Sequence, residues 1–139
     1  MIDKFDGDYA FLSNFYFSPI KEGVITYPTV EHYFQAQKTT NPETRFFISK
    51  AANPSEAKRR GRRVELRSDW EDIKFSLMER GLRAKFMIPE LREKLLATGE
   101  EELVEGNWWG DTCWGVCNGV GENNLGKLLM KIREELRVN

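Results

Sequence analysis

The sequence predicts a mainly α-helical (α+β) fold: a single compact domain, residues 1–139, of about five or six helices with a small β-hairpin. Three observations favour this class. A chain of 139 residues suits one hydrophobic core and leaves no room for a second. Apolar residues recur at helical spacing in several segments, most clearly near the C-terminus. One pair of short apolar runs flanks a glycine-containing turn, as in a hairpin.

The hairpin and the helix that follows it lie in the N-terminal part of the chain. The runs Ser18–Ile20 and Val24–Tyr27 flank Lys21-Glu22-Gly23 and predict two short antiparallel strands. Thr29 can then cap a helix that we expect to run to about Thr39.

Four further helices are predicted from start and stop signals. A fifth is predicted from apolar spacing alone. The first of the four begins near Pro42, and the next has Ser55 as its expected cap. A longer helix starts near Trp70, and another opens at Pro89. The last helix carries apolar residues at clear helical spacing, namely Leu125, Leu128, Leu129, Ile132 and Leu136.

Composition and charge argue against several classes of protein. The formal net charge is −1, so no global electrostatic attraction to nucleic acid or membrane is expected. No apolar run approaches the roughly 20 residues of a membrane-spanning helix. The N-terminus lacks the basic start and apolar stretch of a secretory signal, which predicts a cytoplasmic protein. Cys113 and Cys117 indicate neither a disulfide framework nor a zinc knuckle, and we expect no metal and no cofactor.

A polar stripe marks the first well-defined helix. Glu31, Gln35 and Lys38 are spaced i, i+4 and i+7, so on a helix they share one face. A carboxylate can activate water or stabilise a cationic sugar transition state, an amide can orient hydroxyl groups, and an ammonium can hold an anion. The stripe therefore fits a sugar or nucleotide pocket. It also fits the solvated face of an amphipathic helix, and spacing alone leaves both interpretations open.

His32 is the one histidine of the sequence. It follows Glu31 directly, so on a helix the two side chains point about 100° apart and make poor geometry for a catalytic dyad. We interpret His32 as a structural residue or as a hydrogen-bonding wall of the site.

Three of the four tryptophans lie within seven residues, inside the Gly-rich segment 106–121. Indoles in such a loop can stack on a planar base while Asp111 binds its polar edges. The alternative is a loop that fills the core with aromatic side chains. Long irregular segments in compact domains are often functional, which directs attention to this one.

The basic run from Lys58 to Arg63 has two interpretations as well. It could grip a phosphate, for which one or two of its residues suffice, or it could form a solvated helix face. The Gly-rich stretch 119–127 lacks the spacing of a P-loop or of a dinucleotide fingerprint, although it leads into a helix whose N-terminus could bind an anion.

These motifs together resemble the NADAR family and, within it, the YbiA-type branch of N-glycosidases. The resemblance covers nearly the whole chain, and its parts occur in family order. The string Glu31-His32-Tyr33-Phe34-Gln35-Ala36-Gln37-Lys38 is long and unusual, which makes it specific. The other matching motifs are Phe11–Phe15, Gly61-Arg62, Asp69-Trp70, Leu82–Phe86, Trp109–Asp111 and Asn124–Met130.

The resemblance implies a NADAR/YbiA-like fold and hydrolysis of an N-glycosidic bond, with the family's acidic catalytic position at Glu31. Trp70, Trp109 and Asp111 match further positions that the family associates with its site. With the residue patterns above, the expected catalytic residues are Glu31, Lys38 and Asp111. The expected substrate-binding residues are Asn14, Phe15, His32, Gln35, Arg62, Trp70, Trp109 and Gly110.

The YbiA-type branch implies a phosphorylated ribosylamino-pyrimidine intermediate of riboflavin biosynthesis as substrate, with base and ribose 5-phosphate as products. Another branch implies removal of ADP-ribose from guanine, in which case the basic run could track a nucleic-acid backbone; nucleic acid is a partner that the sequence permits but does not favour. A non-catalytic sensor of nucleotide or ADP-ribose and a purely structural domain are the alternatives from other classes. The joint presence of Glu31, Lys38 and Asp111 favours catalysis.

Two mechanisms fit these residues. In the first, Glu31 or Asp111 orients water at C1 and stabilises the positive charge that develops as the C–N bond breaks. In the second, the ribosylamine opens to an imine and Lys38 captures C1 as a Schiff base before water releases the sugar. Glu31 would then shuttle protons.

Overall fold

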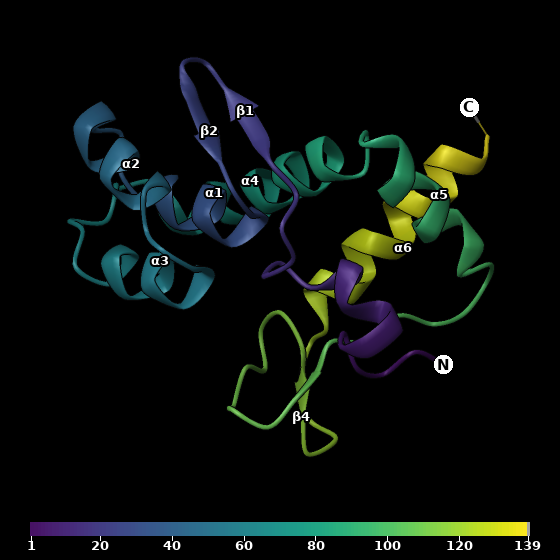
Figure 1. Ribbon diagram of the computed structural model, residues 1–139. Helices are drawn as coiled ribbons and strands as arrows, with labels where there is room; N and C mark the ends of the chain where they lie inside the picture. Colours follow the sequence, from purple (N-terminus) through teal and green to yellow (C-terminus); the bar gives the residue numbers. More distant parts are fainter. Residues whose placement is uncertain (139) are drawn as a thin grey trace. The chain divides into compact units, whose positions relative to one another are not determined.

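The computed structural model describes residues 1–138, which form six α-helices, one short 3-10 helix and four short strands (Figure 1). The mainly helical class and the small hairpin are thereby confirmed. The chain divides into two compact units: a central unit, Asn14–Lys85, and a terminal unit that combines Met1–Ser13 with Phe86–Asn139. The single domain expected from the length of the chain stays a prediction.

In the central unit, strands β1 (Ile20–Glu22) and β2 (Ile25–Tyr27) form an antiparallel hairpin in which Ile20 pairs with Tyr27. Gly23 adopts a φ of +63°, a left-handed conformation that a tight turn needs and that glycine takes at little cost. Lys21 and Glu22, expected in the turn, belong to the first strand, which starts at Ile20 and not at Ser18. Val24 belongs to the turn, so the second strand begins one residue later than the sequence indicated.

Helix α1 (Val30–Ala36) begins where the sequence predicted, because the Thr29 hydroxyl oxygen accepts a hydrogen bond from the backbone N–H of His32 at 3.1 Å. The expected end near Thr39 is wrong, since the helix stops three residues earlier. Beyond it, the N–H groups of Lys38 and Thr39 reach carbonyl groups only three residues back, at 3.2 and 3.4 Å. The last turn therefore tightens into 3-10 geometry and the α-helix cannot continue.

Two asparagine caps start the next helices, α2 (Pro42–Ser49) and α3 (Pro54–Gly61). The side chains of Asn41 and Asn53 each accept a hydrogen bond from the backbone N–H three residues later, at 3.0 and 2.8 Å. Ser55 as the expected cap is wrong. A proline already occupies the first helical position of α3, and the asparagine before it supplies the capping oxygen.

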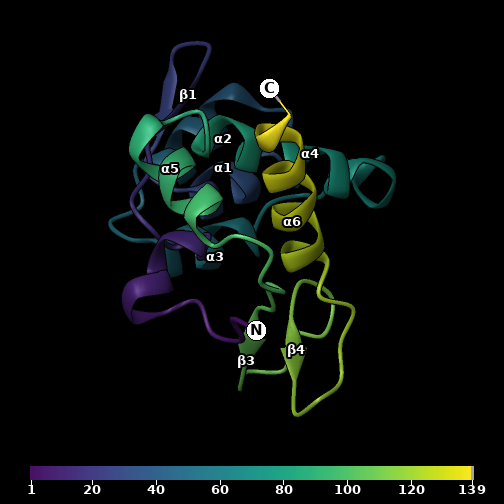
Figure 2. The ribbon, with the colours of Figure 1, turned by 90° about the vertical axis from the view of Figure 1, so that its right-hand side faces the viewer.

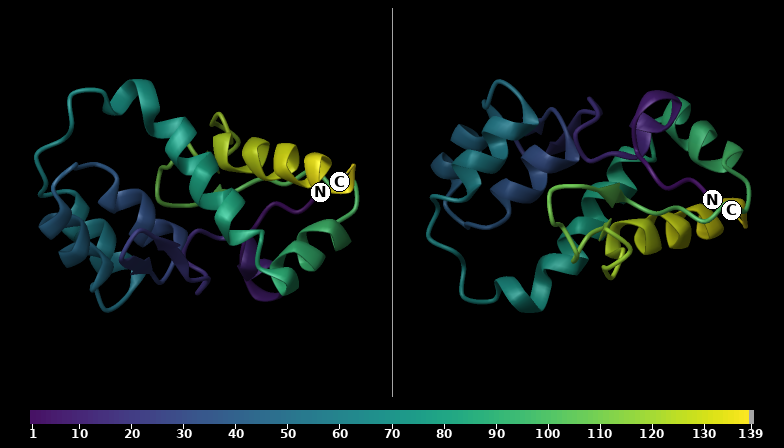
Figure 3. Two further views of the ribbon diagram at one scale, coloured as in Figure 1. Left: turned by 90° about the horizontal axis from the view of Figure 1, so that it is seen from above. Right: turned by 90° about the horizontal axis from the view of Figure 1, so that it is seen from below.

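Helix α1 packs against α2, α3 and α4 (Trp70–Lys85), and α4 starts at the predicted residue (Figure 3). All seven residues of α1 are buried. Helix α1 is therefore a core helix and not an amphipathic surface helix. The buried apolar residues of the central unit are Ile20, Tyr27, Val30, Tyr33, Phe34, Ala36, Ile48, Ala51, Ala57, Trp70, Met78 and Leu82.

The terminal unit contains the 3-10 helix η1 (Gly7–Leu12) and helices α5 (Pro89–Ala97) and α6 (Asn124–Arg137). Helix α5 packs against both α6 and η1 (Figure 2). Helix α5 opens at the predicted proline. None of the helices formed by residues 1–138 has the length and apolar character needed to cross a membrane.

The Gly- and Trp-rich segment of the terminal unit is largely irregular, as expected. Two parallel strands of two residues each, β3 (Gly106–Asn107) and β4 (Val116–Cys117), hold its base together. Ahead of it, Leu103 forms an isolated parallel bridge with Ile2. The segment is thus a loop anchored at both ends.

Candidate active site

Glu31 and Gln35 lie inside the protein, on the buried helix α1. They are 8% and 4% exposed, respectively. Burying a carboxylate and an amide costs free energy unless both are hydrogen-bonded, and Gln35 Nε2 donates to Glu31 Oε1 at 3.0 Å. The solvated-face interpretation of this stripe is therefore wrong, because the two groups form a buried polar pair.

The backbone of Glu31 is held as well. Its N–H donates to the carbonyl oxygen of Asn14 at 3.1 Å, which brings the segment before the hairpin onto the first turn of α1. The Asn14 side chain is directed elsewhere, since its Nδ2 donates to Met78 Sδ at 3.5 Å. Phe15, the next residue, is 45% exposed. Substrate contacts of Asn14 and Phe15 stay predictions.

Lys38 follows the end of α1 and is partly buried. Burial lowers its pKa from the ordinary lysine value, the Glu31 carboxylate raises this pKa, and the cations Arg62 and Lys58 lower it. These four groups are therefore close enough to interact, although the α-helix ends before Lys38. A lysine with a lowered pKa carries more of the neutral amine, which is the nucleophilic form.

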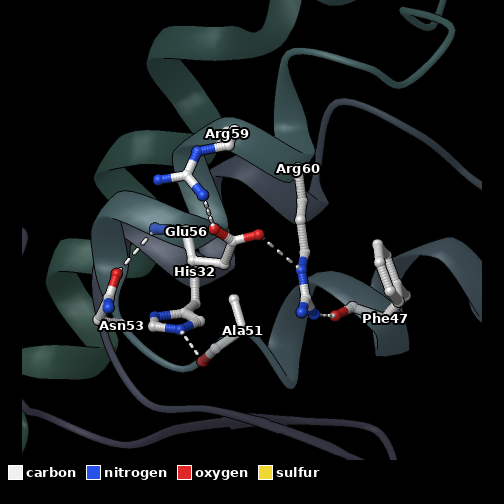
Figure 4. Close-up of polar contacts among 7 residues, drawn as sticks. All are labelled: His32, Phe47, Ala51, Asn53, Glu56, Arg59 and Arg60. Carbon is white, nitrogen blue, oxygen red and sulfur yellow. Dashed lines mark hydrogen bonds and ion pairs between the residues drawn. The ribbon is translucent and has the colours of Figure 1, made fainter.

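Four cations of the basic run at the end of α3 fall into two groups. Lys58 and Arg62 are four residues apart, and both lower the pKa of Lys38. Arg59 and Arg60 are held by ion pairs with a glutamate in the first turn of the same helix (Figure 4). Because one phosphate needs only one or two cations, Lys58 and Arg62 are the candidates from this run.

His32 uses both ring nitrogens inside the central unit. Nε2 donates to the carbonyl oxygen of Ala51 at 3.0 Å (Figure 4), and the Thr29 hydroxyl lies 2.8 Å from Nδ1. Burial lowers the pKa of His32, the bond to Ala51 raises it, and Arg60 lowers it, so the ring is neutral near pH 7. His32 ties α1 to the segment between α2 and α3. This fits the structural interpretation, and a contact with substrate stays a prediction.

Trp70 supports the helix that carries Glu31. It is 7% exposed, and its ring centre lies 5.0 Å from that of Phe34 on α1. Two aromatic rings at this distance stabilise one another beyond the area they bury. A contact between Trp70 and substrate stays a prediction.

Trp109, Gly110 and Asp111 lie in the terminal unit, in the loop between β3 and β4. The Asp111 carboxylate oxygen Oδ1 accepts hydrogen bonds from the backbone N–H groups of Cys113 and Trp114, at 3.1 and 2.9 Å, and so orders the loop. Trp109 is 52% exposed and its neighbour Trp108 is 85% exposed, so these two indoles do not fill the core. A shared site with Glu31 stays a prediction.

Comparison with known proteins establishes the family. The NADAR domain model matches residues 3–137. This chain belongs to the NADAR family. The resemblance carried by the string around Glu31 is thereby confirmed.

Relatives of this NADAR chain are known in sequence and in structure. The N-glycosidase YbiA of Escherichia coli is 44% identical over 138 residues, with 94% of this chain and 84% of that protein covered. The NMR structure of E. coli YbiA matches with a TM-score of 0.85 and 42% identity, over 99% of this chain and 88% of that chain. A riboflavin biosynthesis protein of Vibrio vulnificus is 37% identical over 139 residues, with 95% of this chain but 37% of that protein covered. The NADAR/YbiA-like fold is thereby confirmed.

Side chains that can bind metals do not cluster in the part of this NADAR chain that the structure describes. Within residues 1–138, no group of three or more His, Cys, Asp or Glu side chains comes together in a way that could hold a metal ion. Cys113 and Cys117 are free, half-buried thiols.

Lys85 is a residue that the sequence analysis named only as part of a motif. It is fully buried at the end of α4, and its Nζ lies 5.8 Å from the centre of the Tyr16 ring. Burial lowers its pKa to about 7. A basic residue in the last turn of a helix ordinarily sits in solvent and complements the helix dipole, so no sequence signal separates Lys85 from such residues.

The stability of the protein is expected to depend on pH through Lys85. Its pKa falls from 10.5 to about 7 on folding. Between these values the unfolded chain binds a proton that the folded chain does not, so the free energy of unfolding rises as pH increases from about 7 towards 10. Lys85→Met should lose this component of the rise. Urea unfolding at pH 7 and pH 9 measures the free energy of unfolding of the wild type and of Lys85→Met. An equal rise with pH in the two proteins would show that Lys85 is not the group responsible.

Proposed function

We propose that this NADAR chain acts in the cytoplasm and hydrolyses the C1–N bond of a phosphorylated ribosylamino-pyrimidine intermediate of riboflavin biosynthesis, releasing the base and ribose 5-phosphate. Its relationship to YbiA, named an N-glycosidase, makes it an N-glycosyl hydrolase. The relationship to a riboflavin biosynthesis protein supports the substrate class. The observation that carries the proposal is the buried Glu31 carboxylate, held by an amide and flanked by Lys38.

This group of residues suits cleavage of a ribose C1–N bond. As that bond breaks, positive charge develops on the sugar, and a carboxylate stabilises this charge best where water is largely excluded. Glu31 meets that condition at 8% exposure. In the overall reaction water supplies a hydroxyl group to C1 and a proton to the departing nitrogen.

Two routes lead to these products. In one, Glu31 or Asp111 orients the water that attacks C1. In the other, the ring-opened imine is captured by the amine of Lys38, the base leaves, and water releases the sugar from the resulting Schiff base. The lowered pKa of Lys38 and its interaction with Glu31 favour the second route.

The phosphate of the substrate has its candidate partners next to the same residues. Arg62 and Lys58 both act electrostatically on Lys38, which itself interacts with the Glu31 carboxylate. A guanidinium with an ammonium can hold a phosphate dianion by charge-assisted hydrogen bonds. We therefore propose that Arg62 and Lys58 bind the 5-phosphate.

Arg62→Ala is expected to raise KM for the phosphorylated substrate by about tenfold or more, because a charged hydrogen bond made throughout the reaction is lost. Lys58→Ala should act in the same direction. For the ribosylamine without its phosphate, neither change should alter KM. Steady-state kinetics on the two substrates measure the difference.

Arg63→Ala, an exposed cation of the same run, is the matched control and should affect neither substrate. If Arg62→Ala and Lys58→Ala raise KM equally for substrates with and without phosphate, these residues do not bind the phosphate.

A second candidate function is removal of ADP-ribose from guanine in nucleic acid, which the surface of α2 favours. Phe46 and Phe47 are 51% and 56% exposed. Lys50 Nζ lies 5.1 Å from the centre of the first ring, and Arg60 Cζ lies 4.1 Å from the centre of the second. Exposed aromatic rings beside cations can stack bases and contact phosphates. Turnover that falls steeply with added salt would favour this function.

A further inference from the structure

Gly61 is the last residue of α3, and it is buried against Gln35 of α1. A methyl group on Gly61 would come within 2.9 Å of both Cβ and Cδ of Gln35, closer than non-bonded carbon atoms approach. It would also overlap Gln35 Oε1. Gly61 lies in a helix, where alanine is the better residue. The requirement for glycine here is therefore steric and not conformational.

The amide of Gln35 is held between Gly61 and Glu31. Its Oε1 faces the backbone of Gly61, and this buried atom has no hydrogen-bond partner among residues 1–138. Its Nε2 donates to Glu31 Oε1 at 3.0 Å. An ionised carboxylate accepts hydrogen bonds and does not donate them, so the NH2 end of the amide must face Glu31. The reversed amide would bring two acceptor oxygens together.

Leaving an amide oxygen buried without a partner is costly. The arrangement is stable because the other end of the amide makes a charge-assisted bond, which is stronger than a neutral one. Gln35 is 96% buried, that is 4% exposed, so its side chain cannot swing aside to make room for a larger residue at position 61. The position of α3 at Gly61 therefore determines where the Gln35 amide lies, and this amide in turn positions the Glu31 carboxylate.

We infer that Gly61 and Gln35 are positioning residues for Glu31: the glycine lets α3 close on the amide, and the amide holds the carboxylate in place and ionised. The inference rests on the proposed function, in which Glu31 is the catalytic residue. It gives Gln35 a role that acts through Glu31, in place of the substrate-binding role expected from the sequence. It also gives Gly61 a function that no motif assigned to it.

A double-mutant cycle over Gln35→Ala and Gly61→Ala tests the inference. Each single change should lower kcat by about tenfold or more, with KM changed less than about twofold, because one charged hydrogen bond to the catalytic group is lost. The double variant should be no slower than Gln35→Ala, since Gly61 acts through an amide that is already absent.

The pH profile of kcat/KM distinguishes a positioning role from a merely structural one, because loss of a structural contact alone would not shift its acidic limb. Without its amide donor, the Glu31 carboxylate is protonated more easily, so the acidic limb should move to higher pH in both single variants. Among the charged groups around this carboxylate, Lys38 interacts with it directly, and Lys58 and Arg62 act in turn on Lys38. These three remain in every variant of the cycle.

Gly81→Ala is the matched control. A methyl group on Gly81 of α4 would crowd the Tyr33 ring of α1, at 2.9 Å from Cδ2. This change should lower the thermal midpoint as Gly61→Ala does, yet leave the acidic limb in place. When Gln35→Ala is added to Gly61→Ala, it should restore the thermal midpoint that Gly61→Ala lowers. When it is added to Gly81→Ala, the midpoint should stay low.

The outcomes separate this inference from the proposed function. The positioning role is overturned if the losses of kcat or of thermal midpoint in the double-mutant cycle are additive. It is also overturned if Gly81→Ala shifts the acidic limb as much as Gly61→Ala does. Both conclusions hold even if the wild type cleaves the substrate. A raised KM with unchanged kcat in Gln35→Ala also overturns the positioning role and returns Gln35 to substrate binding. A wild type that cleaves no ribosylamine overturns the proposed function, and the midpoint cycle still decides whether Gly61 acts through Gln35.

Discussion

Glu31→Gln is expected to lower kcat by at least about 100-fold, the usual loss when an acid–base group is removed. The substitution keeps the shape of the side chain, and its amide oxygen can still accept the hydrogen bond from Gln35 Nε2. The protein should therefore fold normally while losing the negative charge at the sugar. Steady-state kinetics with the phosphorylated ribosylamine, together with a thermal midpoint, measure both effects.

Glu65→Gln is a suitable control, because Glu65 is exposed and belongs to the same unit. It should retain the wild-type rate. A Glu31→Gln protein with a near-normal kcat on a substrate that the wild type cleaves would remove Glu31 from the centre of the mechanism.

Reduction with borohydride during turnover is expected to attach one pentose phosphate to Lys38. The lowered pKa of this lysine increases its fraction of neutral amine, and its interaction with Glu31 places it beside the proposed site of reaction. Borohydride reduces a Schiff base to a stable secondary amine, which peptide mapping by mass spectrometry locates. Lys38→Met should give no adduct and should turn over far more slowly than the wild type.

Lys50→Met, which removes an exposed lysine of the same unit, should be trapped as readily as the wild type. If the wild type gives no adduct under turnover conditions, direct attack by water is the remaining route. An adduct on Lys85 alone would move the nucleophile to the other lysine whose pKa is lowered.

The sequence predicts local structure well wherever a signal is local. The Thr29 cap, the proline that opens α5 and the start of α4 at Trp70 all depend on a few adjacent residues, and each is found as expected. Ser55 fails as a cap because two candidates compete within three residues, and the geometry set by the proline selects Asn53.

The sequence predicts the environment of the site poorly, because burial is decided by distant segments. The polar stripe of α1 resembles an exposed face, yet α2, α3 and α4 all pack against this helix and leave Glu31 and Gln35 inside. The same limit applies to Gly61 and Lys85. A glycine at the end of a helix resembles a stop signal and a lysine there resembles a surface charge until their neighbours are known.

The electrostatic grouping of Lys38, Lys58 and Arg62 could be predicted from the sequence only in part. Spacing predicted that Glu31 and Lys38 would lie near one another, and they do interact, although through a tightened turn and not a continuous helix. Spacing could not tell which cations of the basic run accompany them, because this depends on how α3 packs against α1.

The most direct test of the central claim is product analysis by mass spectrometry on two substrates in parallel. The purified protein is incubated with a phosphorylated ribosylamino-pyrimidine and, separately, with an oligonucleotide that carries ADP-ribosylated guanine. We predict that the ribosylamino-pyrimidine releases free base and ribose 5-phosphate and that this release depends on Glu31. We predict little or no release of ADP-ribose from the oligonucleotide. ADP-ribose released from the oligonucleotide, with the ribosylamine left intact, would contradict the proposed substrate, and no product from either would contradict the proposed N-glycosidase.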